Sequence, residues 1–215
     1  MKNISLLVEN AKTPLCYWFT LNKIIMKYSI PTIIAIFCIS QFALGAGHDN
    51  QGLAKHSEEL PTGPQITAQD VAEAQKAWGD AVVAIGKAGE DASEVAKSAA
   101  KSAYAFELGA IQFKPTLASE TPFRPDLEGA LSYFVSGNPK YAEDKGFALK
   151  PWSKVRFSNH TIKYQGNIAI AMGHYFFTGP DKKETKVEYT KGYIKLRDGR
   201  VLIFLQDSSL PYSSN

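Results

Sequence analysis

The feature of this sequence that most restricts its fold is a run of four strand-like segments near its carboxyl end. Each segment is rich in β-branched and aromatic residues, and short turns separate one from the next. The last turn, Asp198-Gly199, is a favoured pair for a two-residue hairpin. Sequential strands on tight turns pair as antiparallel neighbours. The sequence therefore predicts an antiparallel meander built from residues 155–164, 168–178, 186–196 and 201–209.

Helical patterns precede these strands. Thr67 followed by Asp70 resembles a capping box, and apolar residues then recur at helical spacing over 71–85. Glycines end this first helix, and an alanine-rich second helix with a narrow face of small residues follows. Residues 106–116 have a strand-like composition, and a third helix is expected from Pro125 to Gly137. Three helices and one early strand are therefore expected before the meander.

Residues 26–46 have the parts of a cleaved signal peptide, which are a basic start, an apolar centre and small residues at the end. The apolar centre is too short to span a membrane, which takes about 20 apolar residues. We interpret residues 1–25 as an upstream extension from a misplaced start, with an uncleaved anchor as the alternative. Residues 47–65 are a polar leader, and 66–215 form the domain. The signal beginning at Met26 predicts a periplasmic or secreted protein.

Charge and cysteine content restrict the partners of the exported part. The first 46 residues carry the whole formal net charge of +3, so the remainder is neutral. A neutral domain lacks the basic surface that nucleic acids or acidic membranes require, and we expect neither partner after signal cleavage. Cys16 and Cys38 both precede the expected cleavage point, which leaves no disulfide or thiolate metal site. No metal or other cofactor is expected.

Four segments carry a family resemblance, namely 109–116, 128–134, 173–178 and 207–212, the last of which contains Ser-Ser-Leu-Pro. Together with the element order, they resemble the SnoaL-like and calcium/calmodulin kinase association-domain branch of the NTF2-like superfamily over residues 67–212. The resemblance implies an α+β cone, in which a curved antiparallel sheet wraps around the amino-terminal helices. It also implies a cavity inside the cone and a homodimer. Relatives often carry histidines just before the final Ser-Ser pair, where this chain has Gln206 and Asp207.

A histidine and an aspartate are the candidate catalytic residues. Strand alternation places His174 on one face with Ile170 and Met172, and we expect this apolar face to point inward. Asp207 and Ser209 end a similar face of the last strand. If the two strands are neighbours, His174 and Asp207 form an acid/base pair. In the alternative interpretation, His174 is a core residue with satisfied nitrogens, and Asp207 caps a turn.

Aromatic residues suggest a second site. Large rings lining a cone favour a flat apolar ligand, although aromatic residues also build the core of any curved sheet. A cluster of lysines and arginines over 182–200 alternates with acidic residues and is expected to be a solvated sheet edge. The residues expected to contact the ligand are Trp78, Tyr104, Phe113, Tyr193 and Ser209.

These observations lead to one functional expectation with two alternatives. We expect an exported homodimer that binds a small apolar or aromatic molecule in its cone and is not primarily an enzyme. The first alternative is a cofactor-free isomerase or hydro-lyase that uses His174 and Asp207, with Tyr193 or Ser209 as a hydrogen-bond donor. The second alternative is a structural oligomerisation module whose cavity is filled by its own side chains.

Overall fold

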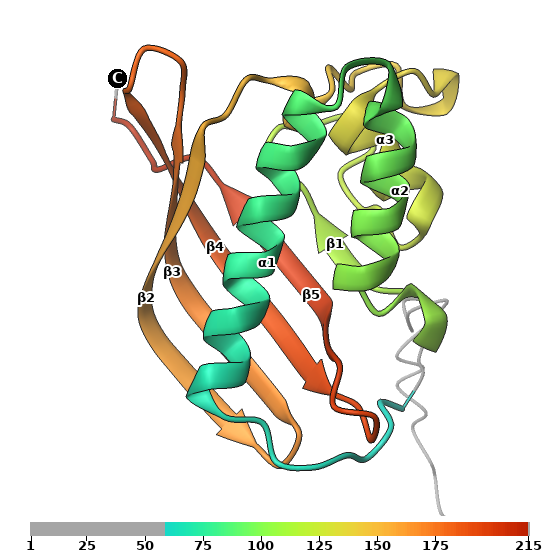
Figure 1. Cartoon of the computed structure of the whole chain (residues 1–215), viewed down its shortest axis with the longest axis vertical. Helices are drawn as coiled ribbons and strands as arrows, with labels where there is room; N and C mark the ends of the chain where they lie inside the picture. Colours follow the sequence, from blue (N-terminus) through green and yellow to red (C-terminus); the bar gives the residue numbers. More distant parts are fainter. Residues whose placement is uncertain (1–58, 215) are drawn as a thin grey trace, which may run out of the picture. The chain divides into compact units, whose positions relative to one another are not determined.

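A computed structural model describes residues 59–214 of the chain (Figure 1). The upstream extension, the signal peptide and most of the leader expected from the sequence lie outside these described residues. Within them, no helix combines the length and the apolar character needed to cross a membrane.

Three α-helices form as the sequence predicts. The first is capped by Thr67, whose side chain accepts a hydrogen bond from the Asp70 backbone, and the Asp70 carboxylate accepts one from the Thr67 backbone at 2.8 Å. The third is capped by the Asp126 side chain, which accepts from the Gly129 backbone at 2.8 Å. These caps satisfy amide groups that have no partner within the helix. The helices are α1 (Ala68–Lys87), α2 (Ala92–Ala103) and α3 (Leu127–Val135), with short 3-10 turns at Gly89–Asp91, Phe106–Leu108, Pro139–Tyr141 and Phe147–Leu149.

The predicted meander is present as four long antiparallel strands, to which a short parallel strand adds at one edge. The order across the sheet is β1-β5-β4-β3-β2. The segment expected as a strand over 106–116 is mostly irregular, because Gly109 has a φ of 114° that breaks the extended backbone. The strands are β1 (Gln112–Lys114), β2 (Lys154–Gln165), β3 (Ile168–Thr178), β4 (Glu184–Lys195) and β5 (Val201–Ser209).

Helix α1 lies across one face of this curved sheet, and α2 and α3 lie beside it (Figure 1). Its buried residues, which include Val71, Trp78 and Val82, provide the apolar stripe that covers the sheet. Ala169 and Ala171 of β3 are fully buried beneath the helical layer. The predicted α+β cone, in which a curved and mostly antiparallel sheet wraps around the amino-terminal helices, is therefore confirmed. We call the sheet face that α1 covers the inner face and the opposite one the outer face.

An irregularity in the last hairpin decides which residues of β5 reach the inner face. Gly192 pairs with Leu205 whereas Tyr193 pairs with Ile203, so Phe204 is an extra residue on β5. A side chain at Gly192 would clash, because its Cβ would lie 2.6 Å from the Phe204 ring. The bulge reverses the alternation of inward and outward side chains along β5. Gln206 and Ser208 are therefore buried, whereas Asp207 and Ser209 are exposed.

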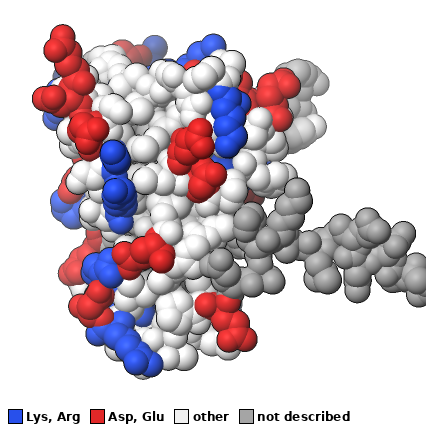
Figure 2. Space-filling view, turned by 90° about the vertical axis from the view of Figure 1, so that its right-hand side faces the viewer, with Lys and Arg blue, Asp and Glu red and all other residues white. Residues whose placement is uncertain are grey.

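Charged side chains do not gather by sign on the side of the molecule that Figure 2 shows. Lysine and arginine residues are interspersed there with aspartate and glutamate residues. Some charged residues of the surface form exposed ion pairs, such as Arg200 with Glu107 and Asp198. Such pairs hold surface loops together and contribute little each to stability.

Candidate functional site

Four hydroxyl groups meet inside the cone, near the carboxyl end of β5. Thr116 comes from the segment after β1, Tyr133 from α3, Tyr175 from β3 and Ser208 from β5. The Thr116 Oγ1 donates a hydrogen bond to the Ser208 Oγ at 3.0 Å. The hydroxyls of Tyr133 and Tyr175 both lie near Thr116, and that of Tyr175 also lies near Ser208. We call these four residues the hydroxyl cluster.

The sheet topology brings these residues together from distant parts of the chain. Parallel pairing of β1 and β5 sets Lys114 opposite Asp207, so Thr116 emerges beside Ser208. The bulge at Phe204 turns Ser208 toward the inner face. Tyr133 is fixed by an edge-to-face contact with Phe113, at 6.1 Å between ring centroids.

Burial keeps the two phenols of the cluster protonated. Tyr133 and Tyr175 are 6% and 2% exposed. Desolvation raises the pKa of Tyr133 to about 12, and the nearby Thr116 side chain opposes part of that rise. Desolvation also raises the pKa of Tyr175, against the effect of Ser208. Both phenols are therefore hydrogen-bond donors at neutral pH, and the Tyr133 hydroxyl has no partner of good geometry among residues 59–214.

This arrangement suits a small ligand that carries several oxygen atoms. Each hydroxyl can donate one hydrogen bond and accept others, so the cluster can adapt to both acceptors and donors. Its surroundings are aromatic, since Phe113 stacks on Phe134 at 6.1 Å and Phe147 meets Phe177 at 5.0 Å. Donors in such an apolar setting interact with developing charge more strongly than they would in water.

The rest of the cone interior is filled by packed rings. Trp78 stacks on Tyr175 at 5.6 Å between centroids, and its indole nitrogen donates to the Tyr104 hydroxyl at 2.8 Å. The pocket that Trp78 and Tyr104 line between α1 and α2 has a volume of only about 10 Å³. Of the residues expected to contact a ligand, Trp78, Tyr104, Phe113 and Tyr193 are all at most 3% exposed and belong to the core. The interior leaves no room there for a flat aromatic molecule.

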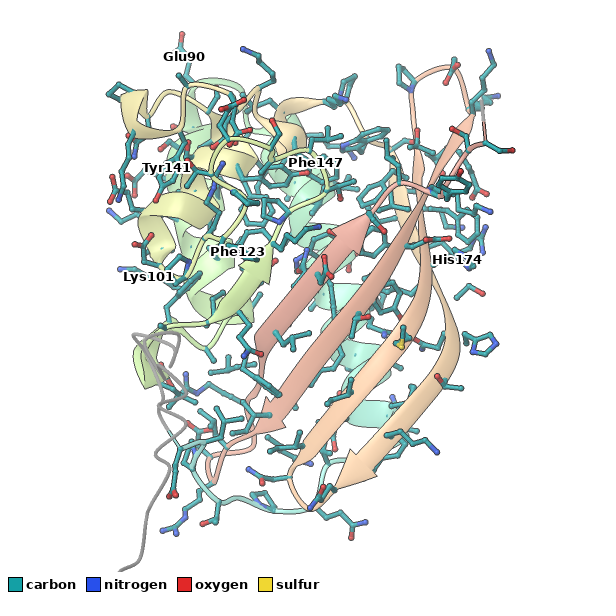
Figure 3. The ribbon with its side chains drawn as sticks, turned by 180° about the vertical axis from the view of Figure 1, so that it is seen from behind. Glu90, Lys101, Phe123, Tyr141, Phe147 and His174 are labelled. Carbon is teal, nitrogen blue, oxygen red and sulfur yellow. The ribbon has the colours of Figure 1, made fainter. Side chains whose placement is uncertain are left out.

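The expected inward orientation of His174 and Asp207 is wrong. The inner face of β3 carries Ala169, Ala171, Tyr175 and Phe177, so His174 lies on the outer face, where its side chain is 39% exposed. Figure 3 shows His174 on the sheet, away from Tyr141 and Phe147. Strand alternation gave the wrong face for His174 because both faces of β3 carry apolar residues.

Asp207 is also exposed, and it pairs with Lys114 at 3.1 Å. Strand β4 separates β3 from β5, so the two residues are not on neighbouring strands. Both border an open groove of about 540 Å³ on the outer face, where the closest acidic group to His174 is Glu188, at 3.8 Å from its Nε2. The acid/base pair expected from the sequence therefore does not form.

Ser209 also points outward, whereas its neighbour Ser208 belongs to the hydroxyl cluster. Sequence reasoning missed Thr116, Tyr133, Tyr175 and Ser208 as site residues. The available signal was that all four lie in the segments that carry the family resemblance, 109–116, 128–134, 173–178 and 207–212. Among residues 59–214, no group of three or more histidine, cysteine, aspartate or glutamate side chains is arranged to hold a metal ion.

Comparison with known proteins identifies relatives of this chain. A family model described as metal-independent carbonic anhydrase matches residues 69–210. The metal-independent carbonic anhydrase of Nostoc sp. (strain PCC 7120) is 42% identical over 153 residues, which are 68% of this chain and 75% of that protein. The crystal structure of an iota-carbonic anhydrase from a cyanobacterium, complexed with bicarbonate, is 37% identical with a TM-score of 0.69. The match covers 74% of this chain and 100% of the cyanobacterial chain.

Proposed function

The chain belongs to the metal-independent carbonic anhydrase family, and we propose that it catalyses the reversible hydration of carbon dioxide to bicarbonate. The family overturns the functional expectation drawn from the sequence. A binding domain for apolar or aromatic molecules is wrong, and so are an isomerase or lyase built on His174 and Asp207 and a purely structural module. The resemblance to the NTF2-like superfamily predicted the fold correctly but did not name this family.

The observation that carries the proposal is the hydroxyl cluster. Bicarbonate has three oxygens and one proton, so it needs several donors and at least one acceptor within a small space. Thr116, Ser208 and the two tyrosines offer both. Carbon dioxide has no charge and no proton, and the aromatic wall around the cluster suits it.

Hydration requires that water attack the carbon while negative charge develops on the carbon dioxide oxygens. In our proposal the free Tyr133 hydroxyl donates to one of these oxygens. The Thr116 and Ser208 hydroxyls hold the attacking water in line with the carbon. As the new O–C bond forms, this hydroxyl pair relays one proton of the water to a carbon dioxide oxygen, which gives carbonic acid. Carbonic acid then ionises to bicarbonate and a proton that solvent takes up. Because burial raises the pKa of both tyrosines, they act as protonated donors and not as bases at neutral pH.

Two adjacent serines give the test. Ser208→Ala removes a hydroxyl of the cluster, whereas Ser209→Ala removes one from the outer face. We expect Ser208→Ala to reduce carbon dioxide hydration, measured by stopped-flow pH change, by about 100-fold, because it removes a group that positions the attacking water. Ser209→Ala should resemble the wild type. Equal activity of the two variants, with both folded by circular dichroism, would remove the hydroxyl cluster from the mechanism.

The compartment is part of the proposal. Residues 26–46 have the composition of a signal peptide, and we propose that the enzyme is exported to the periplasm or beyond. Mass spectrometry of exported material should find an amino terminus near Gly47. An intact Met1 would contradict export.

We also propose that the protein is a homodimer joined through the outer face of the sheet. Ile170 and Met172 of β3 expose 42% and 53% of their surface there, next to His174. Apolar residues clustered on one sheet face are typical of an interface. Met172→Lys should convert the dimer to a monomer in light scattering, and a wild-type monomer would refute the proposal.

A further inference from the structure

Lys191 is buried in the cone and has no polar partner within the part of the chain that the structure describes. It lies on the inner face of β4 and has no exposed surface. Its Nζ forms no hydrogen bond with any of residues 59–214. A buried amine without a partner carries a large desolvation cost, and native proteins contain few of them. The mechanism proposed above does not use this residue.

Aromatic rings surround the amine. The Nζ lies 3.5 Å from the centroid of the Trp78 ring, 5.1 Å from that of Phe157 and 5.4 Å from that of Tyr175. Ring faces attract a cation, so this cage stabilises the ammonium form in part. Burial acts in the opposite direction and lowers the pKa of Lys191 well below its usual value. Each protonation state is therefore partly disfavoured, and a nearby charge can decide between them.

No other charged group faces Lys191 from the elements packed around it. The buried side chains of α1 include Gln75 and Trp78 but no ionisable one. The residues paired with Lys191 across the sheet are Ala171 of β3 and Gln206 of β5. The titratable groups near it are tyrosines whose pKa burial raises, which keeps them neutral, and they are Tyr175, Tyr189 and Tyr193.

Tyr175 connects this amine to the hydroxyl cluster. One part of its ring lies beside the Lys191 Nζ, and its hydroxyl lies near Ser208 and Thr116. An anion held by the cluster would therefore be about one tyrosine ring away from the amine, within an apolar interior. Charges at such separations interact strongly when water is excluded.

We propose that Lys191 is a positioning residue that controls the affinity of the hydroxyl cluster for the bicarbonate anion through its own protonation. The ammonium form, held against Trp78, favours bound bicarbonate, and the neutral form favours its release and the binding of uncharged carbon dioxide. This inference rests on the proposed function. Coupling of this kind is reciprocal, so bound bicarbonate must raise the pKa of Lys191 by as much as the ammonium raises bicarbonate affinity.

The sign of the pH dependence follows from this coupling. Bicarbonate affinity is highest below the pKa of Lys191 and falls as the pH rises through it. We expect a change of about 10-fold, which equals a pKa shift of about one unit. Lys191→Met keeps a long unbranched side chain and removes the buried amine, so it should fold and bind bicarbonate with a pH-independent affinity. Lys186→Met, on an exposed position of the same strand, is the matched control.

The test combines binding and spectroscopy. Bicarbonate affinity is measured by calorimetry across the pH range in which bicarbonate is the dominant species, for wild type, Lys191→Met and Lys186→Met. In parallel, the Lys191 signal of protein labelled with ¹³C at lysine Cε is titrated with and without bicarbonate, and the Met variant assigns it. We expect about 10-fold weaker binding in Lys191→Met at the low end of the pH range and an upward pKa shift in wild type.

The outcomes separate the two proposals. If wild type binds bicarbonate but Lys191→Met has the same affinity and pH dependence, the role of Lys191 is refuted and the proposed function stands. An equal loss of affinity at every pH, or a Lys191 pKa that bicarbonate does not move, also refutes it. If wild type binds no bicarbonate, both proposals fail.

Discussion

Two fully buried cations in this protein are accommodated in opposite ways. Arg124, in the segment before α3, donates to the Thr121 and Gly129 carbonyls, to Asp144 at 2.8 Å and to Glu143 at 3.1 Å. Its guanidinium also stacks on the Tyr141 ring, at 4.1 Å from the centroid. Lys191, inside the cone, lies over aromatic rings, and its Nζ has no hydrogen bond to any described residue.

The difference separates a structural charge from an uncompensated one. Burial opposes the charge of Arg124, but the hydrogen bonds and charges of Asp144 and Glu143 outweigh it and raise the pKa of the guanidinium. For Lys191 no carboxylate opposes burial, which outweighs the attraction of the rings and lowers the pKa. A compensated cation holds a loop in place, whereas an uncompensated one destabilises the fold and calls for another explanation. The comparison predicts opposite effects on stability when each cation is removed.

Removal of Arg124 should have the largest effect. Arg124→Met leaves Asp144, whose side chain is 2% exposed, and Glu143 without their cation. Breaking a buried ion pair on one side costs about 3–5 kcal/mol, and we expect that loss in the free energy of unfolding measured with urea. The control is Arg156→Met, which breaks an exposed pair with Glu184 and should cost less than about 1 kcal/mol. Similar losses in both variants would mean that Arg124 is no more structural than a surface residue.

Removal of the Glu143 carboxylate should have the next largest effect on the free energy of unfolding, and this effect should depend on pH. Its carboxylate accepts hydrogen bonds from the backbones of Ser119, Glu120 and Thr121, which lower its pKa to about 2. A carboxyl group whose pKa is lower in the folded than in the unfolded state stabilises the protein at pH values above the unfolded-state pKa. This contribution is lost as the pH falls toward 2. Glu143→Gln presents an amide group to backbone donors and should cost about 2–3 kcal/mol at neutral pH.

The measurement is urea unfolding between neutral pH and about pH 2.5, where the stability of Glu143→Gln should depend less on pH than that of wild type. Glu120→Gln changes an exposed neighbour and serves as the control. If Glu143→Gln loses stability with acid as steeply as wild type does, then Glu143 does not supply this pH dependence.

The fold could be predicted from the sequence because its local signals agree with each other. The Thr67 capping box, the helical spacing over 71–85 and the turn at Asp198-Gly199 each indicate one structure, and the observed elements match them. The early strand was predicted too long, because the composition of 106–116 does not reveal the positive φ at Gly109. Phe106–Leu108, which precede this glycine, form a 3-10 turn although their composition is typical of a strand.

The site could not be predicted, because it depends on two features that alternation does not show. The bulge at Phe204 exchanges the faces of Ser208 and Ser209, and one extra residue in a strand leaves no clear sequence signal. The outer face of β3 is as apolar as the inner one, so His174 could not be assigned to the correct side. Residues with hydroxyl groups are also common in loops and helices, so nothing in the sequence singled out Thr116 and Tyr133 as site residues.

Removal of Lys191 should have the smallest effect, and in the opposite direction. Lys191→Met relieves the desolvation of an unpaired amine, which costs about 1–3 kcal/mol, and loses a cation–π contact worth up to about 2 kcal/mol. At high pH the amine is neutral in both the folded and the unfolded state, and we expect the free energy of unfolding to rise by about 1 kcal/mol in the variant. Because burial lowers the pKa of Lys191, the gain should be larger below the unfolded-state pKa, where folding must either bury the charge or release the proton. Urea unfolding of this variant beside Lys186→Met measures the difference. A loss of stability would mean that the rings compensate Lys191 as fully as the carboxylates compensate Arg124, and the contrast between the two cations would disappear.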